Sequence, residues 1–332
     1  MSGDARDAAG VRPPALAASR VADGELADAL ARALPAPVRI RARRASPYAS
    51  SFPLAELDVE TGSGERLTVV WKDLSPDALL PAARAARDGV AGDPARELRA
   101  YALLDGAGLD TPRRIAAVEE PGRTWLFLEA VPGARLEHVG DPAAWAATAR
   151  WLARAHAVLP ARVLARAREN ERQWPPHWQP PDPDTLAAAA PDPQRRRRLA
   201  ALAPALAAAG ARLADVPAGV IHGELYAANV LIGEHGRVCA LDWETIARGP
   251  ALLDLATLTA GAWEQPGDPL AAAYRDALPD PPPAATFHAD LAAARLLTAA
   301  RWLATPASWT PPPEQARDWL ADAEAIAGRM TA

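Results

Sequence analysis

Strand-like and helix-like patterns occupy separate parts of this 332-residue chain. Short alternating or apolar segments appear between Val38 and Ala130, and turn residues such as Gly62-Ser63-Gly64 and Pro121-Gly122 separate them. After Pro132-Gly133 the spacing of apolar residues becomes mainly helical. Because runs of strands followed by runs of helices are typical of α+β folds, we expect a small antiparallel sheet and then a mostly helical region.

The predicted elements are short in the first part and long in the second. Strands are predicted over residues 38–42, 54–60, 66–71, 114–118 and 124–130, and helices over 8–34, 79–104, 145–159 and 194–213. Pro94 is expected in the first turn of a second helix within 79–104. The Pro-rich segment 174–184 predicts an irregular connection.

Composition excludes several classes of function. A net charge of −5 argues against a nucleic-acid partner and fits a cationic or neutral one. Cys239 is the only cysteine, so neither an internal disulfide nor a zinc site built from cysteines is possible. The polar start of the chain does not resemble a signal peptide, and its apolar stretches are too short to cross a bilayer. We therefore expect a cytoplasmic protein without a membrane partner.

The chemistry-bearing residues gather in a β-like island of the second part. It reads His222-Gly223-Glu224-Leu225-Tyr226-Ala227-Ala228-Asn229 and ends, after a predicted hairpin, at Asp242-Trp243-Glu244. Kinase catalytic loops place an asparagine metal ligand five positions after the catalytic acid and a second metal ligand after the following hairpin. Asn229 lies five positions after Glu224, and a hairpin would return Asp242 to its side.

This segment resembles the aminoglycoside phosphotransferase and choline kinase group of the kinase-like superfamily. Members carry His-Gly-Asp-x-x-x-x-Asn and an Asp-Trp or Asp-Phe dipeptide, and the segment 249–256 is also similar. The resemblance implies a bilobal protein-kinase-like fold, with a helical extension at 1–37, an N-lobe at 38–132 and a C-lobe with the active site at 133–332. It also implies that Asp254 supports the catalytic loop, that His222 shapes the loop, and that His156 is a packing residue.

The roles that follow are those of a phosphotransferase using Mg²⁺ and ATP or GTP. Glu224, with Asn229 beside it, is the predicted catalytic acid, and Asn229 and Asp242 are the predicted Mg²⁺ ligands. Lys72, the only lysine of the chain, ends an apolar strand and is expected to bind the nucleotide phosphates. Glu97 on the next helix is its predicted partner.

Further nucleotide contacts are predicted with less support from the residues themselves. Ser50 and Ser51 are expected to cap the phosphates with their hydroxyls. The resemblance makes residues 126–131 the hinge that meets the nucleobase, which includes Glu129 and Val131.

Two features depart from the family pattern. Glu224 stands where most members have Asp, which moves the carboxylate by roughly 1.5 Å, about one C–C bond. The loop 46–52, which should cover the phosphates, contains no glycine. A catalytically impaired pseudokinase that only binds nucleotide is therefore a competing interpretation.

Several single residues, and the acceptor itself, are open to more than one interpretation. Glu97 could pair with Arg96 or Arg99 on an exposed helix face, and Glu224 and Asp242 could be solvated surface acids. Trp263, Glu264 and Asp268 fit either a pocket for a cationic acceptor such as an aminoglycoside or a core tryptophan with a polar loop. A kinase for a peptide or biosynthetic-intermediate hydroxyl is a further possibility, with 174–184 as a wider acceptor wall.

Overall fold

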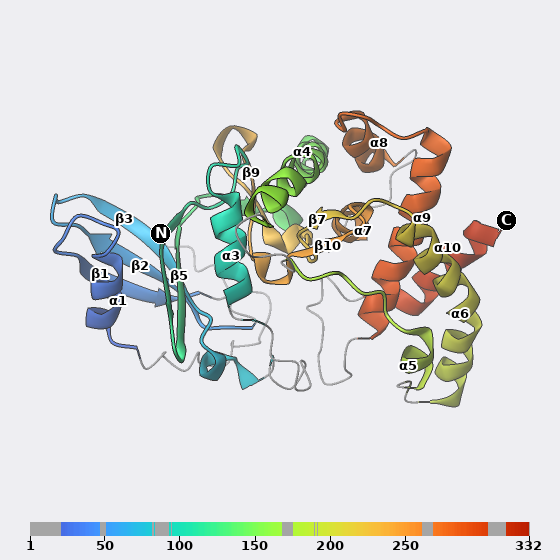
Figure 1. Cartoon of the computed structure of the whole chain (residues 1–332), viewed down its shortest axis with the longest axis horizontal. Helices are drawn as coiled ribbons and strands as arrows, with labels where there is room; N and C mark the ends of the chain where they lie inside the picture. Colours follow the sequence, from blue (N-terminus) through green and yellow to red (C-terminus); the bar gives the residue numbers. More distant parts are fainter. Residues whose placement is uncertain are drawn as a thin grey trace, which may run out of the picture. The chain divides into compact units, whose positions relative to one another are not determined.

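The chain divides into two compact units, whose elements Figure 1 colours along the sequence. The computed structural model describes residues 21–46, 51–81, 83, 93, 95–167, 175–188, 190, 192–260, 268–304 and 317–331. The first unit contains the described residues of 1–91 together with 114–130, and the second contains those of 92–113 together with 131–332. The division at 131 lies next to the predicted N-lobe boundary, but it assigns residues 95–113 to the second unit. The predicted lobes themselves stay a prediction.

An antiparallel sheet forms the first unit, as the sequence predicts. Its strands are β1 (Arg39–Ala45), β2 (Leu54–Glu60), β3 (Arg66–Asp73), β4 (Arg114–Glu120) and β5 (Arg123–Glu129). They lie in the order β1-β2-β3-β5-β4, and every neighbouring pair is antiparallel. β1 extends beyond the predicted strand because its pairing with β2 continues to Ala45.

Helix α1 (Asp23–Leu30) packs its apolar side against this sheet. Leu26 and Leu30 are fully buried in one core cluster with side chains of the sheet that include Trp71 and Trp125. The rings of these two tryptophans meet edge to face, with centroids 6.1 Å apart. Among the described residues of the predicted helix 8–34, Asp23–Leu30 form α1, and residues 8–20 lie outside the described part of the chain.

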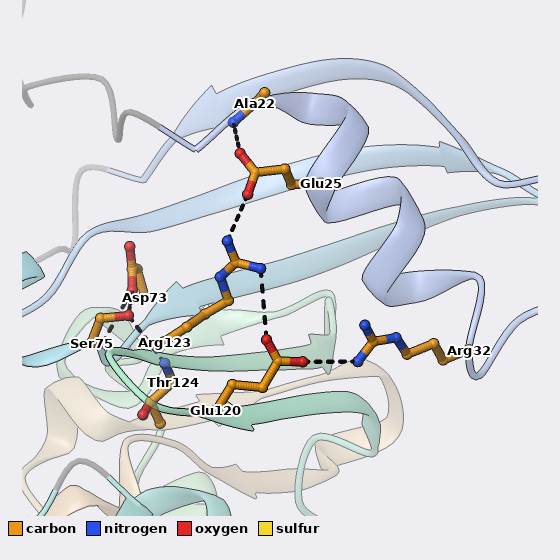
Figure 2. Close-up of polar contacts among 8 residues, drawn as sticks. All are labelled: Ala22, Glu25, Arg32, Asp73, Ser75, Glu120, Arg123 and Thr124. Carbon is orange, nitrogen blue, oxygen red and sulfur yellow. Dashed lines mark hydrogen bonds and ion pairs between the residues drawn. The ribbon is translucent and has the colours of Figure 1, made fainter.

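Polar contacts on the surface of the first unit join α1 to the β4–β5 hairpin. Figure 2 shows the Arg123 guanidinium between the carboxylates of Glu25 and Glu120, at 2.8 and 3.8 Å, and Arg32 on the far side of Glu120 at 3.3 Å. These side chains are all more than two-fifths exposed, so each pair adds little to stability.

A second contact in Figure 2 fixes the end of β3, where Lys72 lies. The Ser75 hydroxyl donates to the Asp73 carboxylate at 2.6 Å and accepts from the backbone N–H of Thr124 at 3.1 Å. Burial raises the pKa of Asp73, although its hydrogen bonds with Ser75 oppose that shift. The end of the strand is thus held by buried hydrogen bonds to β5.

Helices dominate the second unit. They are α3 (Ala95–Leu104), α4 (Pro142–Ala167), α5 (Pro183–Ala188), α6 (Pro193–Ala214), α7 (Leu252–Ala260), α8 (Pro269–Asp276), α9 (Ala284–Leu303) and α10 (Trp319–Thr331). The short strands are β6 (Ala134–Arg135), β7 (Gly219–Ile221), β8 (Val230–Ile232), β9 (Val238–Ala240) and β10 (Ala247–Gly249). Helix α9 contacts α6, α7 and α10, and much of its length is buried.

The predicted helices of this unit agree with α3, α4 and α6, with small differences at their ends. Within the predicted helix 79–104, α3 is the second part, and Pro94 lies outside the described residues. The predicted irregular connection holds over 175–182, but α5 begins at Pro183, whose fixed φ suits a first helical turn. Asp182 accepts from the Thr185 N–H at 2.9 Å and caps that turn.

No membrane crossing is indicated by these elements. Among the helices that the structure describes, none combines the length and the hydropathy that a bilayer crossing requires.

The packing of α1 generates a test of the first unit's core. Leu30→Ala is expected to lower the free energy of unfolding by about 2–5 kcal/mol, because it opens a cavity beneath a fully buried side chain. Asp28→Ala, on the exposed side of the same helix, should change it by less than about 0.5 kcal/mol. Urea unfolding of both variants measures the difference, and equal effects would contradict the packing of α1.

Candidate active site

A buried carboxylate holds the loop that contains the predicted catalytic acid. The loop follows β7, which pairs with β10, and Asp254 lies in the first turn of α7. Asp254 accepts hydrogen bonds from the backbone N–H groups of His222 and Gly223 at 2.6 and 2.8 Å. Its side chain is 1% exposed, so both amides are satisfied away from water. Asp254 therefore fixes the backbone directly before Glu224.

The same carboxylate is the centre of a longer buried chain of hydrogen bonds. His156 of α4 contacts it through Nε2 at 3.1 Å, and the other ring nitrogen of His156 contacts the Tyr274 hydroxyl at 2.8 Å. Burial opposes ionisation of Asp254, but its hydrogen bonds with His156 and the Gly223 N–H, together with the electrostatic attraction of His156, outweigh burial and lower its pKa. The loop is thus tied to α4, α7 and α8 at one point.

His222 shapes the loop through both of its ring nitrogens. Its Nε2 lies 2.7 Å from the carbonyl oxygen of Leu241 and must carry the proton to donate to it. Nδ1 then accepts from the backbone N–H of Glu224 at 3.3 Å. Burial lowers the pKa of His222, so the ring is neutral in this role. These contacts fix the tautomer and use both nitrogens for the loop's geometry.

Gly223 is required by the shape of the loop. Its φ is +89°, a conformation that side chains with a Cβ rarely adopt. A Cβ at this position would also lie 2.5 Å from the carbonyl oxygen of Thr245. A glycine directly before Glu224 is thus a steric requirement.

A hairpin brings the predicted metal ligands back to the loop. β8 pairs antiparallel with β9, with Val230 opposite Ala240, and the Leu241 N–H donates to the Asn229 carbonyl at 2.8 Å. The backbone of Asp242 therefore directly follows a residue bonded to Asn229. The Asn229 side-chain amide donates to the Glu224 carbonyl at 2.9 Å. The loop and the hairpin thus bring Glu224, Asn229 and Asp242 into one small region.

Three carboxylates meet beside this hairpin. One oxygen each of Glu97, Asp242 and Glu244 lies within 4.8 Å of the others, because α3 packs against the turn 243–245. Hard oxygen donors of this kind fit Mg²⁺. Sequence reasoning missed Glu244; its place two residues after Asp242 was the available signal.

Glu97 is 2% exposed, so the interpretation as a residue of an exposed helix face is wrong. Its predicted partner Lys72 belongs to the first unit, and the pair stays a prediction.

The predicted nucleotide residues of the first unit lie at the ends of its central strands. Lys72 is 8% exposed and pairs with Leu54 on β2 and Leu126 on β5. The Ser51 carbonyl accepts from the Leu80 N–H at 2.9 Å, and Ser50 lies outside the described residues. Glu129 ends β5, and Val131 is the first residue of the second unit after it.

Arg301 is the main site residue that sequence reasoning missed. It lies near the end of α9, and its Nη2 donates to Glu224 Oε1 at 2.6 Å. Its Nη1 donates to the Gly223 carbonyl oxygen. No local pattern signals this contact, because 77 residues separate the two side chains in sequence.

An aromatic row extends from the loop to a cavity between helices. Tyr226 packs against Trp302 and Trp302 stacks on Trp319, each pair with centroids 5.2 Å apart. Trp319 lines a cavity of about 700 Å³, whose walls come from α4, α7, α8, α9 and α10. That volume is within the range of small-molecule sites.

Of the predicted acceptor residues, Asp268 lines this cavity. Trp263 and Glu264 lie outside the described residues.

The anchoring by Asp254 generates a stability prediction. Asp254→Asn is expected to lower the free energy of unfolding at pH 7 by about 3 kcal/mol, because an amide oxygen can serve only one of the two N–H donors well. Since the folded protein lowers the pKa of Asp254, its contribution is present above the unfolded value of about 3.9 and is lost as pH falls below it. The variant should therefore lose less stability than wild type between pH 5 and 2, roughly the range in which Asp titrates.

Urea unfolding across that pH range measures both effects. Asp276→Asn, whose side chain is 74% exposed, is the control and should unfold as wild type does. Parallel acid curves for wild type and Asp254→Asn would contradict the assignment.

Comparisons with known proteins agree with this fold. A family model described as the phosphotransferase enzyme family, APH, matches residues 59–287. No curated protein matches the chain by sequence.

Solved structures of two small-molecule kinases share the fold. Choline kinase LicA from Streptococcus pneumoniae is 14% identical, with a TM-score of 0.59 over 92% of this chain and 98% of that one. Spectinomycin phosphotransferase APH(9)-Ia, solved with ADP and spectinomycin, is 12% identical, with a TM-score of 0.51 over 94% and 98%. The predicted family and α+β fold are confirmed. Because the family model matches more than half of this chain, the chain belongs to the phosphotransferase enzyme family.

Proposed function

We propose that this phosphotransferase is a kinase that moves the γ-phosphoryl group of ATP or GTP to a hydroxyl group of a small molecule. The observation that carries the proposal is the geometry of the loop and hairpin of the second unit, which bring Glu224, Asn229 and Asp242 close together. The buried carboxylate of Asp254 holds the backbone of this loop in place. Phosphoryl transfer depends mainly on such positioning and on charge neutralisation.

In the proposed reaction the acceptor oxygen forms a bond to the γ-phosphorus while the bond from that phosphorus to the β–γ bridging oxygen breaks. The Glu224 carboxylate orients the acceptor hydroxyl and takes its proton, which then passes to solvent. The products are the phosphorylated acceptor and the nucleoside diphosphate.

Oxygen ligands for Mg²⁺ are available in the same region. Asp242 and Asn229 are the proposed ligands, and Glu97 and Glu244 add carboxylates within 4.8 Å of that of Asp242. Bound Mg²⁺ would supply neutralisation of the charge on the β- and γ-phosphates. The residues of this chain contribute hard oxygen donors held on a rigid hairpin and on α3.

Nucleotide binding would use the first unit. The Lys72 side chain is buried near the end of β3, where a fixed positive charge suits phosphate oxygens. Ser50, Ser51, Glu129 and Val131 are the proposed further contacts. The ADP in the spectinomycin phosphotransferase structure supports a nucleotide as the phosphoryl donor.

We place the acceptor in the cavity that Trp319 lines. The row of packed rings Tyr226, Trp302 and Trp319 runs from the loop of Glu224 to this cavity. The charged lining residues in the described part of the chain are Arg295, Arg317, Arg329, Asp268 and Asp322. Both aspartates form ion pairs with lining arginines, Asp268 with Arg295 at 2.6 Å and Asp322 with Arg317 at 2.9 Å. The net positive lining favours a neutral or anionic acceptor over a polycationic aminoglycoside.

The catalytic proposal is tested with Asp242→Asn. Loss of one anionic metal ligand should lower kcat at least about 10²-fold, while unfolding stability stays near that of wild type. Phosphorus NMR with MgATP follows the transfer to a panel that contains spectinomycin, choline and a nucleoside. Asp276→Asn is the matched control with unchanged turnover. Nucleotide binding without turnover by wild type across the panel would favour the pseudokinase interpretation.

The acceptor proposal is tested with Arg329→Glu, which reverses the net charge of the described cavity lining. Arg329 is exposed and has no ion-pair partner among the described residues, so the fold should tolerate the change. We expect kcat/KM for a polycationic aminoglycoside to rise about 5-fold or more relative to that for a neutral nucleoside, on the order of 1 kcal/mol. An unchanged ratio would remove the cavity as the acceptor site.

A further inference from the structure

We propose that Arg301 is a positioning residue that makes glutamate, instead of aspartate, the working catalytic base at position 224. The inference rests on the proposed kinase function and adds a specific dependence to it. Arg301 and Glu224 act as a matched pair, in which the guanidinium holds the longer side chain where its carboxylate meets the acceptor hydroxyl.

One guanidinium holds two neighbouring groups of the catalytic loop. Its Nη2 donates to Glu224 Oε1 at 2.6 Å, and its Nη1 donates to the carbonyl oxygen of Gly223. The arginine and glutamate side chains are 34% and 30% exposed, so they form a partly buried pair at the loop. Two donors in a fixed planar fork define both the position and the direction of the carboxylate.

The backbone of Glu224 is already fixed on both sides. Its N–H donates to His222 Nδ1 at 3.3 Å, and its carbonyl accepts from the Asn229 amide at 2.9 Å. These contacts fix the backbone and do not involve the side chain, which has one more rotatable bond than that of aspartate. Misplacement by about 1 Å can cost about 10²-fold in rate, so the placement of this carboxylate matters for turnover.

Arg301 lies on a helix, α9, that is well packed in the second unit. Helix α9 is buried over much of its length, and Arg212 of α6 pairs with Asp290 of α9 at 2.6 Å. Trp302, the next residue, packs on Tyr226 of the same loop with ring centroids 5.2 Å apart. The Arg301 guanidinium thus reaches Glu224 from a helix that the neighbouring Trp302 holds against the same loop.

The length of the glutamate side chain matches the position of the Arg301 guanidinium. An aspartate at position 224 would withdraw its carboxylate by roughly 1.5 Å, one C–C bond, from the present position. At that distance the 2.6 Å contact with Arg301 opens beyond hydrogen-bond range. Restoring the commoner family residue should therefore reduce activity in this chain.

The test is a double-mutant cycle of Glu224→Asp and Arg301→Gln in the full chain, with Arg301→Lys as the conservative variant. Turnover is measured with MgATP and with the fastest acceptor among spectinomycin, choline and a nucleoside. Arg301→Gln is expected to lower kcat about 10–100-fold, while KM for MgATP changes less than about 2-fold. Lysine should restore part of the loss, since it supplies a charge and one donor. Glu224→Asp should lower kcat in wild type and add little in Arg301→Gln.

The matched control is Arg212→Gln, which breaks an ion pair of equal length on α9 away from the loop. It should leave kcat unchanged. Thermal unfolding of all variants detects a general loss of structure, and equal losses of kcat in Arg212→Gln and Arg301→Gln would overturn the positioning role. Full activity of Glu224→Asp or of Arg301→Gln would also overturn it, with the kinase function intact. Wild type that binds MgATP but never turns over would instead overturn the proposed function, and the positioning role with it.

Discussion

The hydrogen bonds from two backbone amides to the Asp254 carboxylate are the constraint on which the second unit's site depends. A buried carboxylate is costly unless its oxygens are satisfied, and here His222, Gly223 and His156 satisfy them. Because α4, the loop that follows β7 and α7 all contribute to this one group, their positions cannot vary independently. The positive φ of Gly223 then turns the chain directly after these two amides, toward Glu224.

From this point outward, the site is built by short-range contacts of the loop and long-range contacts of the helices. His222 and Asn229 fix the backbone of Glu224, and the hairpin returns Asp242 to the same region. Helix α9 then reaches the loop through Arg301 and Trp302. The local contacts define where the chain runs, and the helices define where its side chains point.

The sequence predicts the parts of this molecule that follow local rules. Alternation of apolar residues predicts the sheet, and the spacing from Glu224 to Asn229 and Asp242 predicts the loop and hairpin. It does not predict Arg301, because contact across 77 residues depends on how α9 packs against the loop. Nor does it predict that Glu97 is buried beside Glu244, since helical charges usually face solvent and only the packing of α3 on the 243–245 turn reverses this.

The isolation of Lys72 has a practical consequence. A chain with one lysine carries a single ε-amine, and in the first unit that amine belongs to a buried side chain at the end of β3. Reagents that modify amines would therefore label Lys72 without background from other side chains. Its rate of acylation or reductive methylation becomes a direct gauge of how open the strand end is, with and without nucleotide.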